Sequence, residues 1–107
     1  MKIEDFNNLN KEMLKECFKT LDFKGHDYTG AAEEDALANF KLVAHTTGLT
    51  PLQVWSVYFH KHVDAIMTFI KKGELKSETI DSRILDAINY LLLLNGLIKE
   101  TENAKRI

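Results

Sequence analysis

Residues Glu78 to Leu94 read ETIDSRILDAINYLLLL, and this stretch decides the fold that we expect for the whole chain. From Ile84 onward it is apolar on almost every side of a helix, which is typical of a helix buried at the centre of a bundle. Asp86 and Asn89 interrupt that pattern, and their spacing of three places both side chains on one face. A buried carboxylate is costly unless it is paired or opens onto a polar cavity. We therefore expect these two residues to mark the functional site.

Length and composition predict one globular domain, residues 1–107, with a modest core. The net charge is only -2 and no long basic run is present, so we expect no direct nucleic-acid binding. The first residues, MKIEDFNNLNKEML, lack the apolar core of a signal peptide, and no apolar run is long enough to span a membrane. Cys17 is the single cysteine, which fits a reducing compartment and therefore a cytoplasmic protein.

The spacing of apolar residues predicts an all-α fold, and the low number of breakers, five glycines and one proline, agrees with it. We expect a compact bundle of four main helices, at about residues 3–21, 31–46, 51–72 and 78–100. The first helix and the tail 101–107 should be peripheral, and the tail should fray. The stretch 21–30, LDFKGHDYTG, contains two glycines and predicts a loop.

Capping residues indicate where the later helices begin and end. Thr50 should be the N-cap of the third helix, with a proline in the first helical position and Gln53 closing a capping box. Gly48 and Gly73 should end the second and third helices. Ser77 is the expected N-cap of the fourth helix.

Two basic residues intrude on the apolar face of the predicted helix 51–72. Its solvated face is a polar stripe at steps of three and four, formed by Gln53, Ser56, His60, Asp64, Thr68 and Lys71. Lys61 instead falls in line with Val57, and His62 falls in line with Tyr58. Because Asp86 and Asn89 intrude in the same way on the fourth helix, we expect a polar pocket between these two helices.

Such a pocket suits an anionic ligand that also carries a hydrogen-bonding base or sugar. Arg83 would add a cation, and Trp55 and Tyr90 could stack on a base, although core packing is the commoner role of an aromatic residue. The alternative is a buried polar network, in which Asp86 pairs with Lys61 or Arg83 and sets how the helices align.

Two further polar groups complete the set of candidates. The predicted loop is dense in charged and aromatic residues, and loops on a rigid scaffold often bind ligands. Asn39 shares a second polar face of helix 31–46 with Asp35. The candidate ligand-binding residues are Lys24, His26, Asp27, Tyr28, Asn39, Trp55, Lys61, His62, Arg83, Asp86, Asn89 and Tyr90.

No sequence motif predicts a catalytic or metal-binding residue. The chain has no Gly-x-Ser-x-Gly turn, no phosphate-binding glycine loop and no zinc signature. His60 and His62 are two residues apart and so point to different sides of a helix. Cys17 lies on the apolar face of the first helix, where a core role is expected.

Four motifs in order resemble a known family. They are KGHDY (24–28), DALANFK (35–41), GLTPLQVWSVYFHKHVDAI (48–66) and SETIDSRILDAINYLLLL (77–94). Together they resemble the small all-α proteins of phages and prophages called nucleotide modification associated domain 1, over about residues 23–100. That family is named for its genomic association with phage base-modification genes. The resemblance implies a nucleotide-related function in an infected bacterial cell.

The chain is also distantly similar to MazG-type all-α nucleoside triphosphate pyrophosphohydrolases, which implies a MazG-like helix packing. Those enzymes hold magnesium with Glu-x-x-Glu on one helix and Glu-x-x-Asp on the next. The corresponding residues here are Lys61 and Asp64, then Asp86 and Asn89. Lysine cannot ligate magnesium but can hold a phosphate. This departure favours nucleotide binding without catalysis and without a cofactor.

Three hypotheses follow. The first is a phage-type protein that sequesters a nucleotide, such as a cyclic dinucleotide or ADP-ribose derivative used in host defence. The second is a Mg²⁺-dependent nucleotide pyrophosphohydrolase, or an accessory factor in phage DNA base modification, with Glu78 and Asp81 supplying further carboxylates. The third is a helical interaction module whose polar residues only specify packing. Under all three, the surplus apolar surface of the last helix predicts a homo-oligomer, a dimer or higher.

Overall fold

The computed structural model describes residues 1–29 and 35–105, with side chains described for 1–21 and 35–105. The described chain forms four helices and no strand: α1 (Ile3–Thr29), α2 (Ala38–Thr47), α3 (Pro51–Lys72) and α4 (Ile80–Lys105). The predicted all-α bundle of four helices is therefore confirmed. No helix within the described ranges combines the length and the apolar character needed to cross a membrane.

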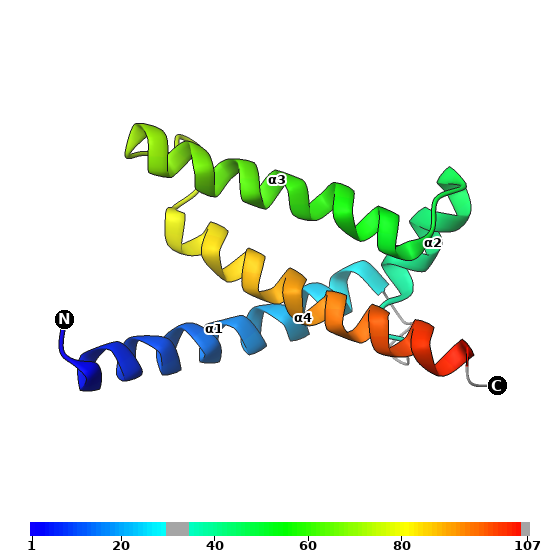
Figure 1. Ribbon diagram of the computed structural model, residues 1–107, viewed down its shortest axis with the longest axis horizontal. Helices are drawn as coiled ribbons and strands as arrows, with labels where there is room; N and C mark the ends of the chain where they lie inside the picture. The colour runs from blue at the N-terminus through cyan, green and yellow to red at the C-terminus, as the bar shows by residue number, and fades with distance from the viewer. Residues whose placement is uncertain (30–34, 106–107) are drawn as a thin grey trace.

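Helix α4 lies in the middle of the molecule, between α3 on one side and α1 on the other (Figure 1). Helix α3 packs along α4, α1 crosses α4, and the short α2 covers one end of α3 (Figure 1). In the described ranges, no Cα atom of α1 comes within 8 Å of α3, so α4 separates them. The central position predicted for the last helix is thus correct.

The apolar core lies where α2, α3 and the second half of α4 meet. Its buried side chains are Leu37, Phe40, Ala44, Val54, Trp55 and Leu97. Helix α4 itself is less buried than its apolar sequence predicts, because Leu91 and Leu92 on its outer side are 51% and 39% exposed. Three helices are too few to surround α4, so part of its apolar surface faces outward.

The capping predictions for α2 and α3 are confirmed. Thr50 Oγ1 accepts a hydrogen bond from Gln53 N at 3.1 Å, and Gln53 Oε1 accepts one from Thr50 N at 2.9 Å. This capping box satisfies two backbone N–H groups that have no partner within the helix. Gly48 and Gly73 end α2 and α3 at φ values of 77° and 79°, which favour glycine over other residues.

Two predicted boundaries near the N-terminal half are wrong. Helix α1 continues to Thr29, so residues 21–29 of the predicted loop are helical. A single internal glycine costs a helix only about 1 kcal/mol, which does not stop one that is already formed. Helix α2 begins at Ala38, because Asp35 Oδ1 accepts a hydrogen bond from Leu37 N at 2.9 Å and holds residues 35–37 in a turn. Residues 31–34 of that prediction lie outside the described residues.

The predicted limits of the fourth helix also differ from the structure. Thr79, not Ser77, caps α4, because Thr79 Oγ1 accepts a hydrogen bond from Ser82 N at 3.1 Å. The helix continues to Lys105, so residues 101–105 are not the frayed tail that we predicted. The Thr101 hydroxyl donates to the carbonyl of Leu97 at 2.8 Å, as it can within a continuous helix.

A charged network joins α2 to α4 beside the core. Lys41 Nζ lies 2.7 Å from Asp35 Oδ2 and 2.7 Å from Glu100 Oε1. The hydrogen bond from Lys41 lowers the pKa of Asp35, and the hydrogen bond to Asp35, followed by that to Glu100, raises the pKa of Lys41. The network therefore stabilises the fold over the pH range in which Asp35 is ionised and Lys41 is protonated.

We expect Lys41→Met to lower the free energy of unfolding by about 0.5–1 kcal/mol at pH 7, because the pair is partly exposed and screened by solvent. The lowered pKa of Asp35 means that this stabilisation is lost as the pH falls through the folded-state pKa, below the ordinary value of 3.8. The raised pKa of Lys41 means that it is lost at the other end only above 10.5. Thermal melts of both proteins at several pH values would measure the difference.

Lys99→Met is the matched control, because among the described residues Lys99 makes only a looser pair of 3.9 Å, with Glu102 on its own helix. It should change the free energy of unfolding by less than about 0.3 kcal/mol at pH 7. A loss of stability in Lys41→Met that stays the same down to pH 3 would show that the charge of Asp35 is not its cause.

Candidate functional site

Three polar side chains meet where the middle of α3 faces α4, as the sequence predicts. His62 comes from α3, and Asp86 and Asn89 come from neighbouring positions on one face of α4. We call these three residues the polar set. His62 Nδ1 lies 4.0 Å from Asp86 Oδ2, and the two side chains are only 13% and 11% exposed. The ring of Tyr90 lies against the imidazole of His62, with centroids 4.7 Å apart.

Asn89 is the most unusual member of the polar set. The residue is 5% exposed, and its Oδ1 is buried without a hydrogen-bond partner among the described residues. A buried acceptor left unsatisfied costs about 1–3 kcal/mol. Most buried polar groups in proteins have a partner, so this one calls for an explanation, such as a ligand that donates to it.

Arg83 lies one turn before Asp86 and extends the polar set toward the start of α4. Its Nε lies 3.2 Å from Glu78 Oε2, and its side chain is 22% exposed. Glu78 thus places a negative charge beside the guanidinium near the end of the polar set. The Nε of Arg83 is buried and has no hydrogen-bond partner among the described residues. A guanidinium carries five N–H donors, so Arg83 can donate to a ligand while it stays paired with Glu78.

Helix α1 reaches the polar set through Cys17. This residue is fully buried, and its thiol donates to the carbonyl of Leu85 at 3.9 Å. Burial, followed by the negative charge of Asp86, raises the pKa of the Cys17 thiol. The predicted core role of Cys17 is confirmed. Its closeness to Asp86 was missed, because no local pattern relates residues that lie so far apart in the sequence.

The candidate aromatic residues pack within the protein. Trp55 Nε1 donates to the carbonyl of Tyr90 at 2.6 Å, and the indole stacks on the ring of Phe59 at 4.6 Å and 15°. The ring of Phe40 on α2 contacts the rings of Tyr58 and Tyr90 edge to face. Trp55 is therefore part of the core, and Tyr90 connects that core to the polar set.

The structure does not place the remaining candidates, Lys61 and Asn39, in the polar set. The prediction that Lys61 lies on the covered face of α3 is wrong, because Lys61 is exposed. Val57, one turn earlier on the same side, is 54% exposed as well, so the described chain leaves this side of α3 uncovered around Lys61. Asn39 is half-buried on α2, next in sequence to Phe40, whose ring contacts Tyr90.

The side chains of the remaining four candidates, Lys24, His26, Asp27 and Tyr28, lie outside the described residues. The backbone at these positions belongs to α1, so they are carried by a helix and not by the predicted loop.

The chemistry of the polar set is that of hydrogen bonding. It combines a carboxylate, an imidazole and a carboxamide, with a guanidinium at its edge. In the described part of the chain, no three His, Cys, Asp or Glu side chains gather in a way that could hold a metal ion.

Comparison with known proteins found no relative: neither a family model, nor a curated protein, nor a solved structure matches the chain.

Proposed function

We propose that the protein binds a nucleotide beside the polar set and holds it without catalysing a reaction. The observation that carries the proposal is the buried Asn89 Oδ1, which lacks a hydrogen-bond partner among the described residues. A donor from a ligand, such as the amino group of a base or a ribose hydroxyl, would satisfy it. The closeness of Asp86 to Asn89 adds an acceptor for a second N–H or O–H group.

The other residues near Asn89 fit the remaining parts of a nucleotide. Arg83 supplies a guanidinium, which binds phosphate oxygens through paired N–H groups. The rings of His62 and of Tyr90, the residue after Asn89, pack together and would offer aromatic groups to a base. A single binding site with hydrogen-bonding, aromatic and cationic groups suits a nucleotide better than it suits a simple anion or an apolar ligand.

Holding the ligand intact is supported by the chemistry of the side chains. The one thiol of the chain, Cys17, is fully buried, and its raised pKa keeps it protonated at neutral pH, so it is a poor nucleophile. The sequence resemblance to phage and prophage proteins supports sequestration of a signalling nucleotide of the host. Cyclic dinucleotides and ADP-ribose derivatives are the first ligands to test.

The test is isothermal titration calorimetry against a panel of nucleotides, followed by mass spectrometry of the recovered ligand. We expect a dissociation constant in the micromolar range or below for at least one nucleotide, and recovery of that nucleotide intact. Recovery of a cleaved product with Mg²⁺ present would overturn the proposal and favour the pyrophosphohydrolase. Failure of every nucleotide to bind would favour a purely structural polar set.

A neighbouring pair of histidines provides a matched control. His62→Gln removes an imidazole from the polar set and should weaken binding at least about 10-fold. His60→Gln makes the same change on the same helix at a position that is 75% exposed, and should leave binding unchanged. Equal effects of the two substitutions would place the ligand elsewhere.

A further inference from the structure

The first half of α1 carries an apolar stripe that no other part of the described chain covers. Ile3, Phe6 and Leu9 are 80%, 53% and 54% exposed. They recur every three residues, and the same face continues with Met13, four residues after Leu9, and with Cys17, four residues after that. Cys17 is buried against α4, whereas the α1 stripe, Ile3, Phe6 and Leu9, extends beyond that contact.

A second exposed apolar stripe lies on the last turns of α3. Val63, Met67 and Ile70, spaced by four and three, are 36%, 57% and 70% exposed. This α3 stripe is thus left largely uncovered by the described part of the chain. The N-terminus of α1 and the C-terminal end of α3 lie at the same end of the molecule (Figure 1).

The surface area of the chain is larger than that of a typical monomer of its size. A monomeric protein of 12.3 kDa exposes roughly 6,100 Å², whereas this chain exposes 8187 Å². Its radius of gyration is 15.9 Å, compared with about 13 Å for a single domain of this length. The excess of about 2,000 Å² per chain matches what a subunit of an obligate dimer buries.

We propose that a second copy of this chain covers both stripes, so that the α1 stripe of each copy packs on the α3 stripe of the other. Such an interface is self-complementary, because a two-fold axis repeats the same pair of contacts twice. It also gives the first turns of α1 the packing that they lack within one chain. Most of the stability of a helix in a protein comes from the packing of its apolar face, so those turns depend on such a contact.

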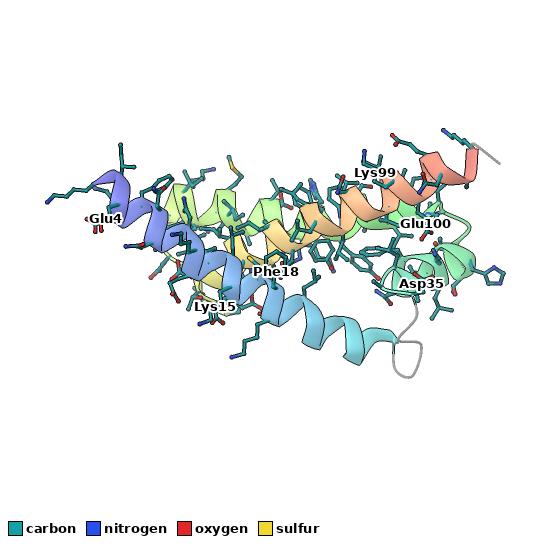
Figure 2. All side chains as sticks on the ribbon, turned by 90° about the horizontal axis from the view of Figure 1, so that it is seen from below. Glu4, Lys15, Phe18, Asp35, Lys99 and Glu100 are labelled. Carbon is teal, nitrogen blue, oxygen red and sulfur yellow. The ribbon has the colours of Figure 1, made fainter. Side chains whose placement is uncertain are left out.

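Charges at the helix ends indicate how α1 of one copy is oriented relative to α3 of the other. The first turn of α1 carries Glu4 and Asp5, and the last turn of α3 carries Lys71 and Lys72. Glu4 lies at the outer end of α1 (Figure 2). If α1 of one copy runs antiparallel to α3 of the other, the acidic turn meets the basic turn. A parallel arrangement would separate these opposite charges, so complementarity favours the antiparallel one.

The test is the molar mass in solution, measured by light scattering during size-exclusion chromatography over a range of concentrations. We expect twice 12.3 kDa for the full chain at tens of micromolar. Phe6→Asp and Met67→Asp should each raise the dimer dissociation constant at least about 100-fold. Leu42→Asp, at a position that is 65% exposed on α2 and belongs to neither stripe, should leave it unchanged.

Charge reversal tests the orientation separately. Asp5→Lys and Lys72→Glu should each weaken the dimer about 5-fold, and the two substitutions together should restore it.

A monomer at every concentration would overturn the proposal, as would a dimer that Phe6→Asp and Met67→Asp leave intact. Circular dichroism checks that both variants keep their helices. Neither stripe includes a residue of the polar set. The dimer proposal and the nucleotide-binding proposal are therefore tested independently, and either can be wrong while the other is right.

Discussion

Trp55→Ala is expected to lower the free energy of unfolding by about 4 kcal/mol, the largest effect of any single substitution considered for this protein. Trp55 is 8% exposed and lies in the core at the contact between α3 and α4. Its truncation removes the stacking on Phe59 and the hydrogen bond to the carbonyl of Tyr90, and leaves a cavity. A domain of this size has a total stability of roughly 5–15 kcal/mol, so the variant would be close to unfolding.

Urea denaturation followed by far-ultraviolet circular dichroism is the measurement, since Trp55 is the only tryptophan and its fluorescence is lost in the variant. Protein concentrations must be equal, because self-association links stability to concentration. Trp55→Phe, which keeps an aromatic ring but not the indole N–H, should cost only about 1–2 kcal/mol. A loss below about 1 kcal/mol in Trp55→Ala would mean that the α3–α4 contact does not depend on this side chain.

Asn89→Leu is expected to separate stability from function. The leucine is similar in size and removes a buried oxygen that has no partner among the described residues, so the free energy of unfolding should rise by about 1 kcal/mol. The same substitution removes the group that we propose to bind the ligand. Nucleotide affinity should therefore fall at least about 100-fold, because a ligand donor would be buried against an apolar side chain.

Thermal melts and calorimetry with the nucleotide that binds best provide the two measurements. Asn95→Leu is the control, because it makes the same change on the same helix at an exposed position. It should leave affinity unchanged. If Asn89→Leu destabilises the protein by more than about 2 kcal/mol, its carboxamide is a structural group with a partner in the free protein, and the reason for placing a ligand there disappears.

Most of the fold was predictable from sequence because its signals are local. Both the capping box at Thr50 and the glycines that end α2 and α3 act within a few residues, so the bounds of α3 were predicted correctly. The polar stripe of α3 is exposed as its periodicity predicts. The errors at the ends of α1 and α4 arose where signals conflict. Gly25 weakens a helix without ending it, and either Ser77 or Thr79 can act as an N-cap.

The candidate site was predicted in part. Asp86 and Asn89 were selected because they are polar in an apolar helix, and both are indeed buried. Lys61 was selected by the same reasoning and is exposed. Periodicity places a residue on a face of its helix but does not say whether another helix covers that face. His62 and Lys61 are adjacent in sequence, and only the position of α4 distinguishes them.

The sequence by itself determined the helices, their faces and most of their ends, since hydrogen bonding and capping within a helix depend on neighbouring residues. The tertiary structure alone decided which faces meet: Cys17 on Leu85, Trp55 on Tyr90, and His62 beside Asp86. The physical reason is that helix packing is set by side-chain shape over whole surfaces, through contacts between residues distant in the chain. It also decided what stays uncovered, and the stripes on α1 and α3 are apolar surface that the four helices of one chain do not bury.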